Sequence, residues 1–546
     1  MTSLGWDTED VSGKAVSGKV GSGKVGSGKV GSGKVGGKAA GRTAVAVAEL
    51  RQLLRDAPRR PTLAAFWVGL GSLLVYTLVR HLLGMSMVDI MVYRAEGQAV
   101  LHHDDLYGIQ VTRWDLFATY PPFAAMLFTP TAWLPVWLLR VLVGGGNLVL
   151  LGTLAWLGAE LVGWPRRTKR PALVFLAVGL GVWLEPVFTT LRYGQVNLLI
   201  DVLVLYDLTR PDSRRSKGVG IGLAAAIKLT PGLFAVYLLL SGRSRAACTA
   251  GASCLGTVLL GALVMPGASA AFWTTYVFDT SRVGKEYIVD NQSLRGLVER
   301  ALRTPDPGAL ALLVTGLVAV GGLALAVAIH RHAAGFPRAR AWSVLCVAVT
   351  GVLVSPISWT HHWVWCVPVL VLLAAEAAQE RARARALPDL SRAHRGLRRP
   401  WRAVFLATGT AFCSYAMWLV PHHGFGNLRI PYPLQPFAAI YPLVGLGFLG
   451  LAAERLRRHL ARQRRRAEAL RAEQRRAAVR RTAEAEPAAV RFERMPTGSV
   501  AGEERGQRPV HVQARVLAPR RDPTEGALQP GGDGAGRGLE QGVPGR

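Results

Sequence analysis

The sequence predicts an all-α polytopic membrane protein, and three observations support this prediction. Half of the 546 residues are hydrophobic and the mean hydropathy is positive, which does not suit a soluble chain of this length. Apolar stretches of about twenty residues recur, which is the length that a helix needs to cross a bilayer. The net charge of +30 is concentrated at the two ends of the chain and between these stretches. Because basic segments alternate with spans, they indicate topology, and nucleic-acid binding is not expected.

The basic segments predict about twelve membrane segments with both ends of the chain in the cytoplasm. Residues 1–60, with their Lys/Gly/Ser repeat, predict a flexible cytoplasmic tail, and residues 61–455 hold the membrane segments. Residues 456–546 begin as a basic helix and become rich in Pro and Gly, which predicts a cytoplasmic, disordered tail. The expected segments are 63–83, a short re-entrant or tilted piece at 120–135, 137–163, 171–190, 195–209, two half-length pieces joined at 228–231, 245–265, 308–330, 341–357, 361–376, 401–420 and 436–453.

This topology gathers polar side chains at the outer face. Asp89 is a carboxylate just beyond the first span, and the stretch 355–365, SPISWTHHWVW, interrupts an apolar run. Ionisable residues at membrane depth are costly, so each is a functional candidate. The other candidates are the cations Arg94, Arg192, Lys228, Arg282 and Lys285, the amides Gln195, Asn197, Asn291 and Gln292, and the histidines His361 and His362.

A carboxylate opposite cationic groups suits the attack of an alcohol on a sugar whose leaving group is a lipid phosphate. A single displacement needs one general base, which takes the proton of the attacking hydroxyl. The phosphate is already a good leaving group, and it needs charge stabilisation rather than covalent chemistry. A cleft at the outer membrane face suits such a donor, because its lipid tail can remain in the bilayer.

Each candidate residue also has a structural alternative. Asp89 would cap an interfacial helix, the paired histidines would be interfacial polar residues, and Lys228 would snorkel or pair with a carboxylate. Two functions therefore stay open: an outer-face membrane enzyme, and a transporter or lipid-linked-sugar flippase, which internal symmetry and ion-pair relays would favour. A membrane scaffold that acts through its basic tails would explain none of the outer-face residues. No carboxylate cluster in the sequence requires a metal.

Six motifs, in order, resemble the polyprenol-phosphate-mannose-dependent α-1,2-mannosyltransferases, family 87 of the glycosyltransferases, which have the GT-C membrane fold. The similarity begins near residue 85, and the last motif ends near residue 375; the likeness extends to about residue 455, and both tails lie outside it. The motifs are VDIMVYRAEGQAVLHHDDLY, TYPPFAAMLFTP, YGQVNLLIDVLVLYDL, GIGLAAAIKLTPGLFAVYLLL, NQSLRGLVER and SPISWTHHWVWCVPVL.

The resemblance implies a function and a set of site residues. The implied reaction is an inverting transfer of mannose from β-linked polyprenyl-phosphate-mannose to a cell-envelope glycolipid or polysaccharide, forming an α-1,2 linkage at the outer face of the plasma membrane. Asp89 would be the general base, and the family's histidine falls on His361 or His362, with His361 preferred because it is nearer the helix start. No metal or cofactor is implied. Tyr120, in the second motif, joins Arg94, Arg192, Gln195, Asn197, Lys228, Asn291 and Gln292 as a substrate-binding candidate.

Overall fold

The computed structural model describes residues 47–492 except residues 50, 54, 86, 113–114, 387–399 and 423. The chain divides into two compact units, residues 1–467 and 468–546, and the first contains all the candidate site residues. This unit is mostly helical, with one short antiparallel strand pair, β1 (Gln110–Val111) and β2 (Leu116–Phe117), among its described residues. The predicted repeat at the N-terminus and the end of the predicted C-terminal tail lie outside the described residues.

The helices establish a multi-pass membrane protein. In the described part of the chain, five helices are long and apolar enough to cross a membrane, or up to seven if each of two bent helix pairs forms one span. The expectation of about twelve segments stays a prediction. The five are α2 (Arg59–Leu82), α5 (Val136–Val162), α11 (Ser244–Val264), α14 (Ala309–Arg331), and α16 (Cys366–Ala386) together with the 3-10 turn η4 (Thr360–Trp365).

Some expected spans are shorter or bent. The expected span 171–190 consists of α6 (Arg170–Gly181) and α7 (Glu185–Tyr193), which meet at a bend of 72°. Pro186 lacks an N–H and is tolerated in the first turn of a helix but not in its interior, so a new helix begins there. The expected span 436–453 has a similar bend of 73°, between Tyr432–Ala438 and the start of α20 (Ile440–Phe492).

Other expected spans become short helices inside the bundle. α15 is surrounded on nearly all sides, because almost every residue between Ala339 and Leu353 is buried. A helix without a lipid-facing side does not need full membrane length, which accounts for its 16 residues. α15 runs over Ala339–Val354. Further short helices are α4 (Pro122–Ala132), α8 (Asn197–Thr209), α9 (Val219–Ile227), α10 (Gly232–Leu240), α12 (Pro266–Thr274), α13 (Leu294–Leu302), α18 (Pro400–Cys413) and α19 (Gln435–Ala438).

Two breaks expected from the sequence are confirmed. α9 ends at Ile227 and α10 begins at Gly232, so Lys228 stands in an extended conformation between two half-length helices. The second break follows α15, which ends at Val354, and the chain turns through Ser355 and Pro356 into η4. Both breaks expose backbone groups and side chains in the interior of the bundle, where irregular backbone is tolerated only if protein or a cavity surrounds it.

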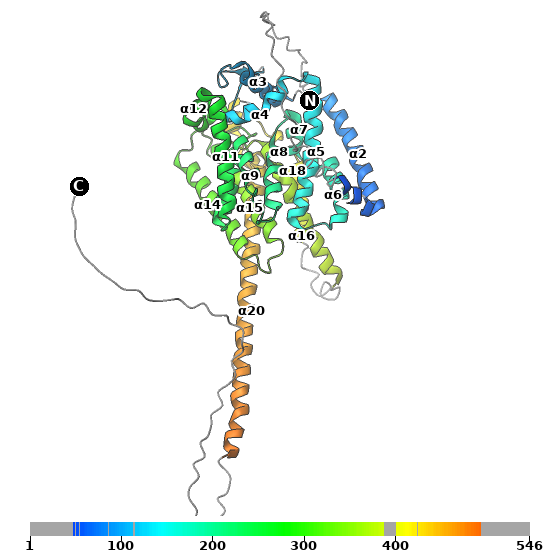
Figure 1. The fold of residues 1–546 in the computed structure, drawn as a ribbon, viewed down its shortest axis with the longest axis vertical. Helices are drawn as coiled ribbons and strands as arrows, with labels where there is room; N and C mark the ends of the chain where they lie inside the picture. Colours follow the sequence, from blue (N-terminus) through cyan, green and yellow to red (C-terminus); the bar gives the residue numbers. More distant parts are fainter. Residues whose placement is uncertain are drawn as a thin grey trace, which may run out of the picture. The chain divides into compact units, whose positions relative to one another are not determined.

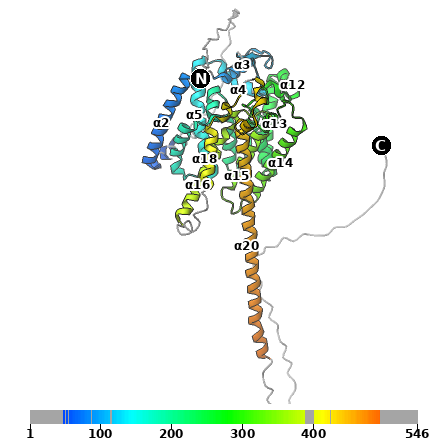
Figure 2. The same cartoon turned by 180° about the vertical axis from the view of Figure 1, so that it is seen from behind.

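Several shorter helices gather at one end of the bundle (Figures 1 and 2). α3 (Val88–His102), α4 and α12 lie together at this end, while α16 extends to the opposite end (Figures 1 and 2). α3 packs against α4 and also contacts α7, and α7 packs against η4. The buried carboxylate of Glu185 fixes α7 further, accepting hydrogen bonds from Thr189 Oγ1 at 2.6 Å and from the Tyr441 hydroxyl of α20 at 2.8 Å.

Candidate functional site

Asp89 lies in the first turn of α3 and is partly buried. Its Oδ2 accepts a short hydrogen bond from Nε2 of Gln195. Burial raises the pKa of Asp89 to about 6, because an ionised carboxylate loses favourable hydration; the Gln195 hydrogen bond and the charge of Lys228 partly oppose this rise. A carboxylate with a pKa close to neutral pH is suited to accept a proton during a reaction.

A chain of polar groups fixes Gln195. Its Oε1 accepts a hydrogen bond from the Tyr93 hydroxyl at 2.7 Å, and the Tyr93 hydroxyl lies 2.9 Å from that of Tyr120. Gln195 itself stands in the break between α7 and α8, just after Gly194, which has a φ of +73°. A Cβ at Gly194 would approach the Cβ of Ile90 to 3.0 Å, so glycine permits both the turn and the close approach of α3.

A second polar cluster surrounds Lys228. Its Nζ lies 2.6 Å from Nε2 of His362 and 3.4 Å from Oδ1 of Asn197. The same Nζ is 6.0 Å from the centre of the Tyr120 ring. Tyr120 thus connects the two clusters, because its hydroxyl reaches the Asp89–Gln195 group and its ring lies beside Lys228. A carboxylate and a cation therefore belong to one connected site.

The two histidines have different surroundings. The backbone oxygen of His361 accepts hydrogen bonds from Asn197 Nδ2 at 3.1 Å and Thr190 Oγ1 at 3.3 Å, which fixes the start of η4 against α7 and α8. The His361 ring is buried, and its Nε2 has no hydrogen-bond partner among the described residues. The ring of His362, 4.9 Å from that of His361, bonds to Lys228 instead. His361 thus has a buried ring nitrogen without a partner among the described residues, whereas His362 contacts the cation and lines the same pocket as Lys228.

The side chains of Asn291 and Gln292 form hydrogen bonds to backbone groups. Asn291 Nδ2 donates to the Pro356 carbonyl at 3.1 Å, and its Oδ1 accepts from the Ser358 N–H at 2.8 Å. Gln292 Nε2 donates to the Ala438 carbonyl at 2.7 Å. The bonds of Asn291 hold the loop that precedes the histidines. The Gln292 amide instead ties its segment to the junction of α19 and α20, because its Oε1 also accepts from the Tyr441 N–H at 3.1 Å.

Three predicted cations contact groups outside the Lys228 cluster. The guanidinium of Arg94 donates to the backbone carbonyls of Thr131, at 2.8 Å, and Leu134, and so ties α3 to the loop after α4. Arg192 lies 5.5 Å from the ring centre of Tyr193, at the end of α7. Arg282 stacks on aromatic rings, 4.3 Å from the centre of the Tyr276 ring.

Asp201 was missed by the sequence reasoning. It is buried on α8, and it lines a pocket together with Asn197, Lys228 and His362. Its Oδ2 has no hydrogen-bond partner among the described residues. The signal was present, since Asp201 is an acidic residue inside the apolar run VNLLIDVLVLYDL and ionisable residues in such runs are functional candidates. Tyr93, by contrast, is an ordinary aromatic residue in the sequence, and only the fold shows its bond to Gln195.

Metal ligands are not gathered in this part of the molecule. Within the described ranges, no three His, Cys, Asp or Glu side chains lie close enough together to hold a metal ion. At this site the described side chains supply a carboxylate, that of Asp89, and a cation, that of Lys228, with His362 beside it.

Comparison with known proteins identifies the family of the chain. The model of Glycosyltransferase family 87 matches residues 118–356. A polyprenol-phosphate-mannose-dependent alpha-(1-2)-phosphatidylinositol mannoside mannosyltransferase of Mycobacterium tuberculosis is 34% identical over 352 residues, covering 61% of this chain and 81% of the relative. A polyprenol-phosphate-mannose-dependent alpha-(1-2)-phosphatidylinositol pentamannoside mannosyltransferase from another strain of that species is 32% identical over 363 residues, covering 63% and 82%. No solved structure matches the chain. From the family match and these relatives, we conclude that the chain is a multi-pass membrane enzyme that belongs to glycosyltransferase family 87.

Proposed function

We propose that this enzyme transfers mannose from polyprenyl-phosphate-mannose to a glycolipid or polysaccharide of the cell envelope, forming an α-1,2 linkage with inversion at the anomeric carbon. The names of the relatives support the donor and the linkage. The observation that carries the mechanism is the connection, through Tyr120, between the carboxylate of Asp89 and the cation of Lys228. One base and one anion-binding group are what a single displacement requires.

In the proposed reaction, a hydroxyl of the acceptor attacks the anomeric carbon of mannose while its proton passes to Asp89. The bond between the anomeric carbon and the phosphate oxygen breaks, and polyprenyl phosphate leaves with the electron pair. Lys228, supported by His362 and Asn197, stabilises the negative charge on this leaving group. Attack on the face opposite the phosphate converts a β-linked donor into an α-linked product.

The proposed orientation follows from the basic segments of the sequence. We place the protein in the plasma membrane with both ends of the chain in the cytoplasm and with the site at the outer face. The polyprenyl chain of the donor then stays in the bilayer while its mannose enters the site from the membrane surface. Asp201, which lines the same pocket as Lys228, would balance the positive charge of Lys228 when no phosphate is present.

The proposal is tested with purified protein, polyprenyl-phosphate-mannose and a phosphatidylinositol mannoside as acceptor. We expect a mannosylated glycolipid whose new linkage is α-1,2 by linkage analysis. A parallel experiment without acceptor, in sealed vesicles, measures movement of the donor between leaflets. If the donor moves between leaflets and no mannosylated product forms, with this acceptor or with mannan acceptors, the protein is a flippase and not a transferase.

A further inference from the structure

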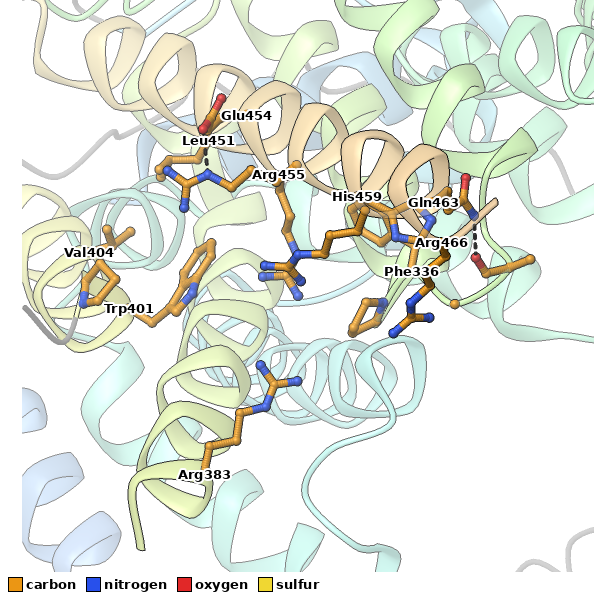
Figure 3. Close-up of a pocket in the computed structure, with 16 residues that line it drawn as sticks. Phe336, Arg383, Trp401, Val404, Leu451, Glu454, Arg455, His459, Gln463 and Arg466 are labelled. Atoms are coloured by element: carbon orange, nitrogen blue, oxygen red, sulfur yellow. Dashed lines mark hydrogen bonds and ion pairs between the residues drawn. The ribbon is translucent and has the colours of Figure 1, made fainter. Parts of the chain in front are cut away.

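Figure 3 shows a second cavity, of about 480 Å³. It lies at the other end of α15 and α16 from His361 and His362. The loop that carries the histidines follows the C-terminal end of α15 and precedes the N-terminal end of α16. The cavity lies at the opposite ends of both helices, beside the connection before α15 and the last turn of α16. The 21 residues of α16 therefore separate the two sites by about 30 Å, at roughly 1.5 Å per residue. The cavity is not part of the proposed transfer site.

The lining of this cavity is strongly cationic. Five arginines and one carboxylate, that of Glu454, line it. Glu454 pairs with Arg457, at 2.6 Å, and with the lining residue Arg458, at 2.5 Å, so the other four lining arginines have no carboxylate partner within the lining. The lining arginines are Arg383, Arg455, Arg458, Arg462 and Arg466. Like charges gathered around one cavity repel one another, so an anion inside the cavity would relieve the repulsion.

Arg455 is the best-fixed of these arginines. One of its terminal nitrogens lies 2.9 Å from the carboxylate of Glu376, which is 3% exposed and which also pairs with Arg338 at 3.3 Å. The guanidinium carbon of Arg455 lies 5.1 Å from the centre of the Trp401 ring. Its Nε is buried without a hydrogen-bond partner among the described residues, as is Nε2 of His459 beside it. The carboxylate of Glu376 thus pairs with two arginines, Arg338 and Arg455. The Nε–H of Arg455 is left without a hydrogen-bond acceptor among the described residues.

Apolar side chains complete the cavity. Phe336, Trp401, Val404 and Leu451 line it together with the arginines, and Arg383 reaches toward it from the opposite wall to Arg455 (Figure 3). A free inorganic anion would need only the charges, whereas an amphiphile would use both kinds of surface. Basic pockets between membrane helices on the cytoplasmic side bind phosphate headgroups of lipids, and tryptophan is enriched at this depth.

We propose that this cavity is a binding site for an anionic phospholipid. Its phosphate group lies among four lining arginines, and its apolar part lies against Trp401 and Val404. These arginines are Arg383, Arg455, Arg462 and Arg466. In the proposed orientation of the chain, this lipid belongs to the cytoplasmic leaflet. The lipid is neither donor nor acceptor of the transfer reaction, so the proposal of a lipid site does not depend on the mannosyltransferase assignment.

The test measures lipid retained by the purified full-length protein in neutral detergent. Native mass spectrometry follows titrations with phosphatidylglycerol, which is anionic, and with phosphatidylcholine, which is zwitterionic. We expect clear preference for phosphatidylglycerol and an affinity at least tenfold lower in the double variant Arg462→Gln/Arg466→Gln, since each lost charge-assisted hydrogen bond to phosphate weakens binding by about that factor or more.

The chain offers a matched control for each variant. Arg464→Gln/Arg465→Gln removes two exposed charges from the same turns of α20 without touching the cavity lining. On α16, Arg383→Gln changes the lining, and Arg385→Gln removes an exposed arginine outside it. We expect both controls to bind phosphatidylglycerol within about twofold of the unmodified protein, and Arg383→Gln to lose binding, because only lining arginines reach the phosphate.

Three results would overturn the proposal. Equal losses in lining and control variants would show unspecific attraction to a basic helix. Unchanged binding in both lining variants would place the lipid elsewhere. Displacement of phosphatidylglycerol by inorganic phosphate, at concentrations where chloride has no effect, would identify a site for free phosphate instead.

Discussion

At the scale of single residues, the environment of Asp89 explains how a carboxylate becomes a base that functions near neutral pH. Burial raises its pKa to about 6, and the Gln195 hydrogen bond limits the rise by stabilising the charged form. A base must be deprotonated to act, so transfer should fall as the pH drops through about 6.

Replacement of Gln195 by leucine tests this arrangement. Gln195→Leu removes the hydrogen bond that favours the ionised carboxylate, so the pKa of Asp89 rises further and the acid limb of the pH profile moves to higher pH. The measurement is kcat/KM for mannose transfer across the pH range on either side of the Asp89 pKa. A lower rate with an unmoved acid limb would mean that Gln195 affects activity only through folding or substrate contact.

Lys228 and Arg94 give contrasting predictions, because one lies in the polar cluster and the other bonds to backbone. Lys228→Met should raise KM for the lipid donor by about 10- to 100-fold, the loss of one charge-assisted contact to phosphate. Arg94→Gln should instead lower thermal stability, since it releases the carbonyls of Thr131 and Leu134, and should change the donor KM less. Donor titrations measure KM and melting curves measure thermal stability for both variants. A raised donor KM in Arg94→Gln and a lowered melting temperature in Lys228→Met would mean that Arg94 binds the donor and Lys228 stabilises the fold.

At the scale of helices, close packing of α2 on α6 depends on glycine. A Cβ at Gly69 would come within 2.7 Å of the Phe175 carbonyl oxygen, whereas a Cβ at Gly71 has no atom within 4 Å. Gly69→Ala should therefore destabilise the protein by about 1–3 kcal/mol, as overpacking typically does. Gly71→Ala, on the same helix, should be neutral or slightly stabilising. Thermal unfolding of the two variants in one detergent measures the difference; equal melting temperatures would show that α2 can shift away from α6 at no cost.

The sequence predicted helix breaks better than it predicted spans. Prolines mark the breaks directly, which is why the positions of Lys228 and the turn at Pro356 agree with the structure. Apolar composition does not distinguish a helix in lipid from one buried in protein, so α15 was expected to be a span and is enclosed by other helices. The bend after Gly181 was missed although Pro186 marks it, because residues 171–190 were expected to form one continuous span.

The candidate site was predictable residue by residue but not as a geometry. Asp89, Gln195, Lys228 and the histidines lie on separate segments, and nothing in the sequence shows that Tyr120 would connect them. The supporting bonds of Asn291 and Gln292 to backbone carbonyls could not be foreseen either, since amides bind sugars and carbonyls with the same groups.

At the scale of the whole molecule, the orientation in the membrane determines which leaflet supplies the donor. The basic segments predict that tags at Met1 and at Arg546 both report the cytoplasm and that a tag near Asp104 reports the outside. Protease protection or cysteine labelling in intact cells measures all three. A tag near Asp104 that reports the cytoplasm would move the site to the inner leaflet, where a cytoplasmic acceptor would have to replace a cell-envelope one.

The central claim is that Asp89 is the general base, and Asp89→Asn tests it most directly. Asparagine keeps the size of the side chain and an oxygen that can accept the Gln195 hydrogen bond, but it cannot take up the acceptor proton. We expect purified Asp89→Asn protein to bind donor and unfold at a normal temperature, while mannose transfer falls by about 10²- to 10⁴-fold. If Asp89 merely stabilised the start of α3, asparagine would replace it well, since both residues serve helix N-termini about equally. Near-normal turnover in this variant would contradict the account.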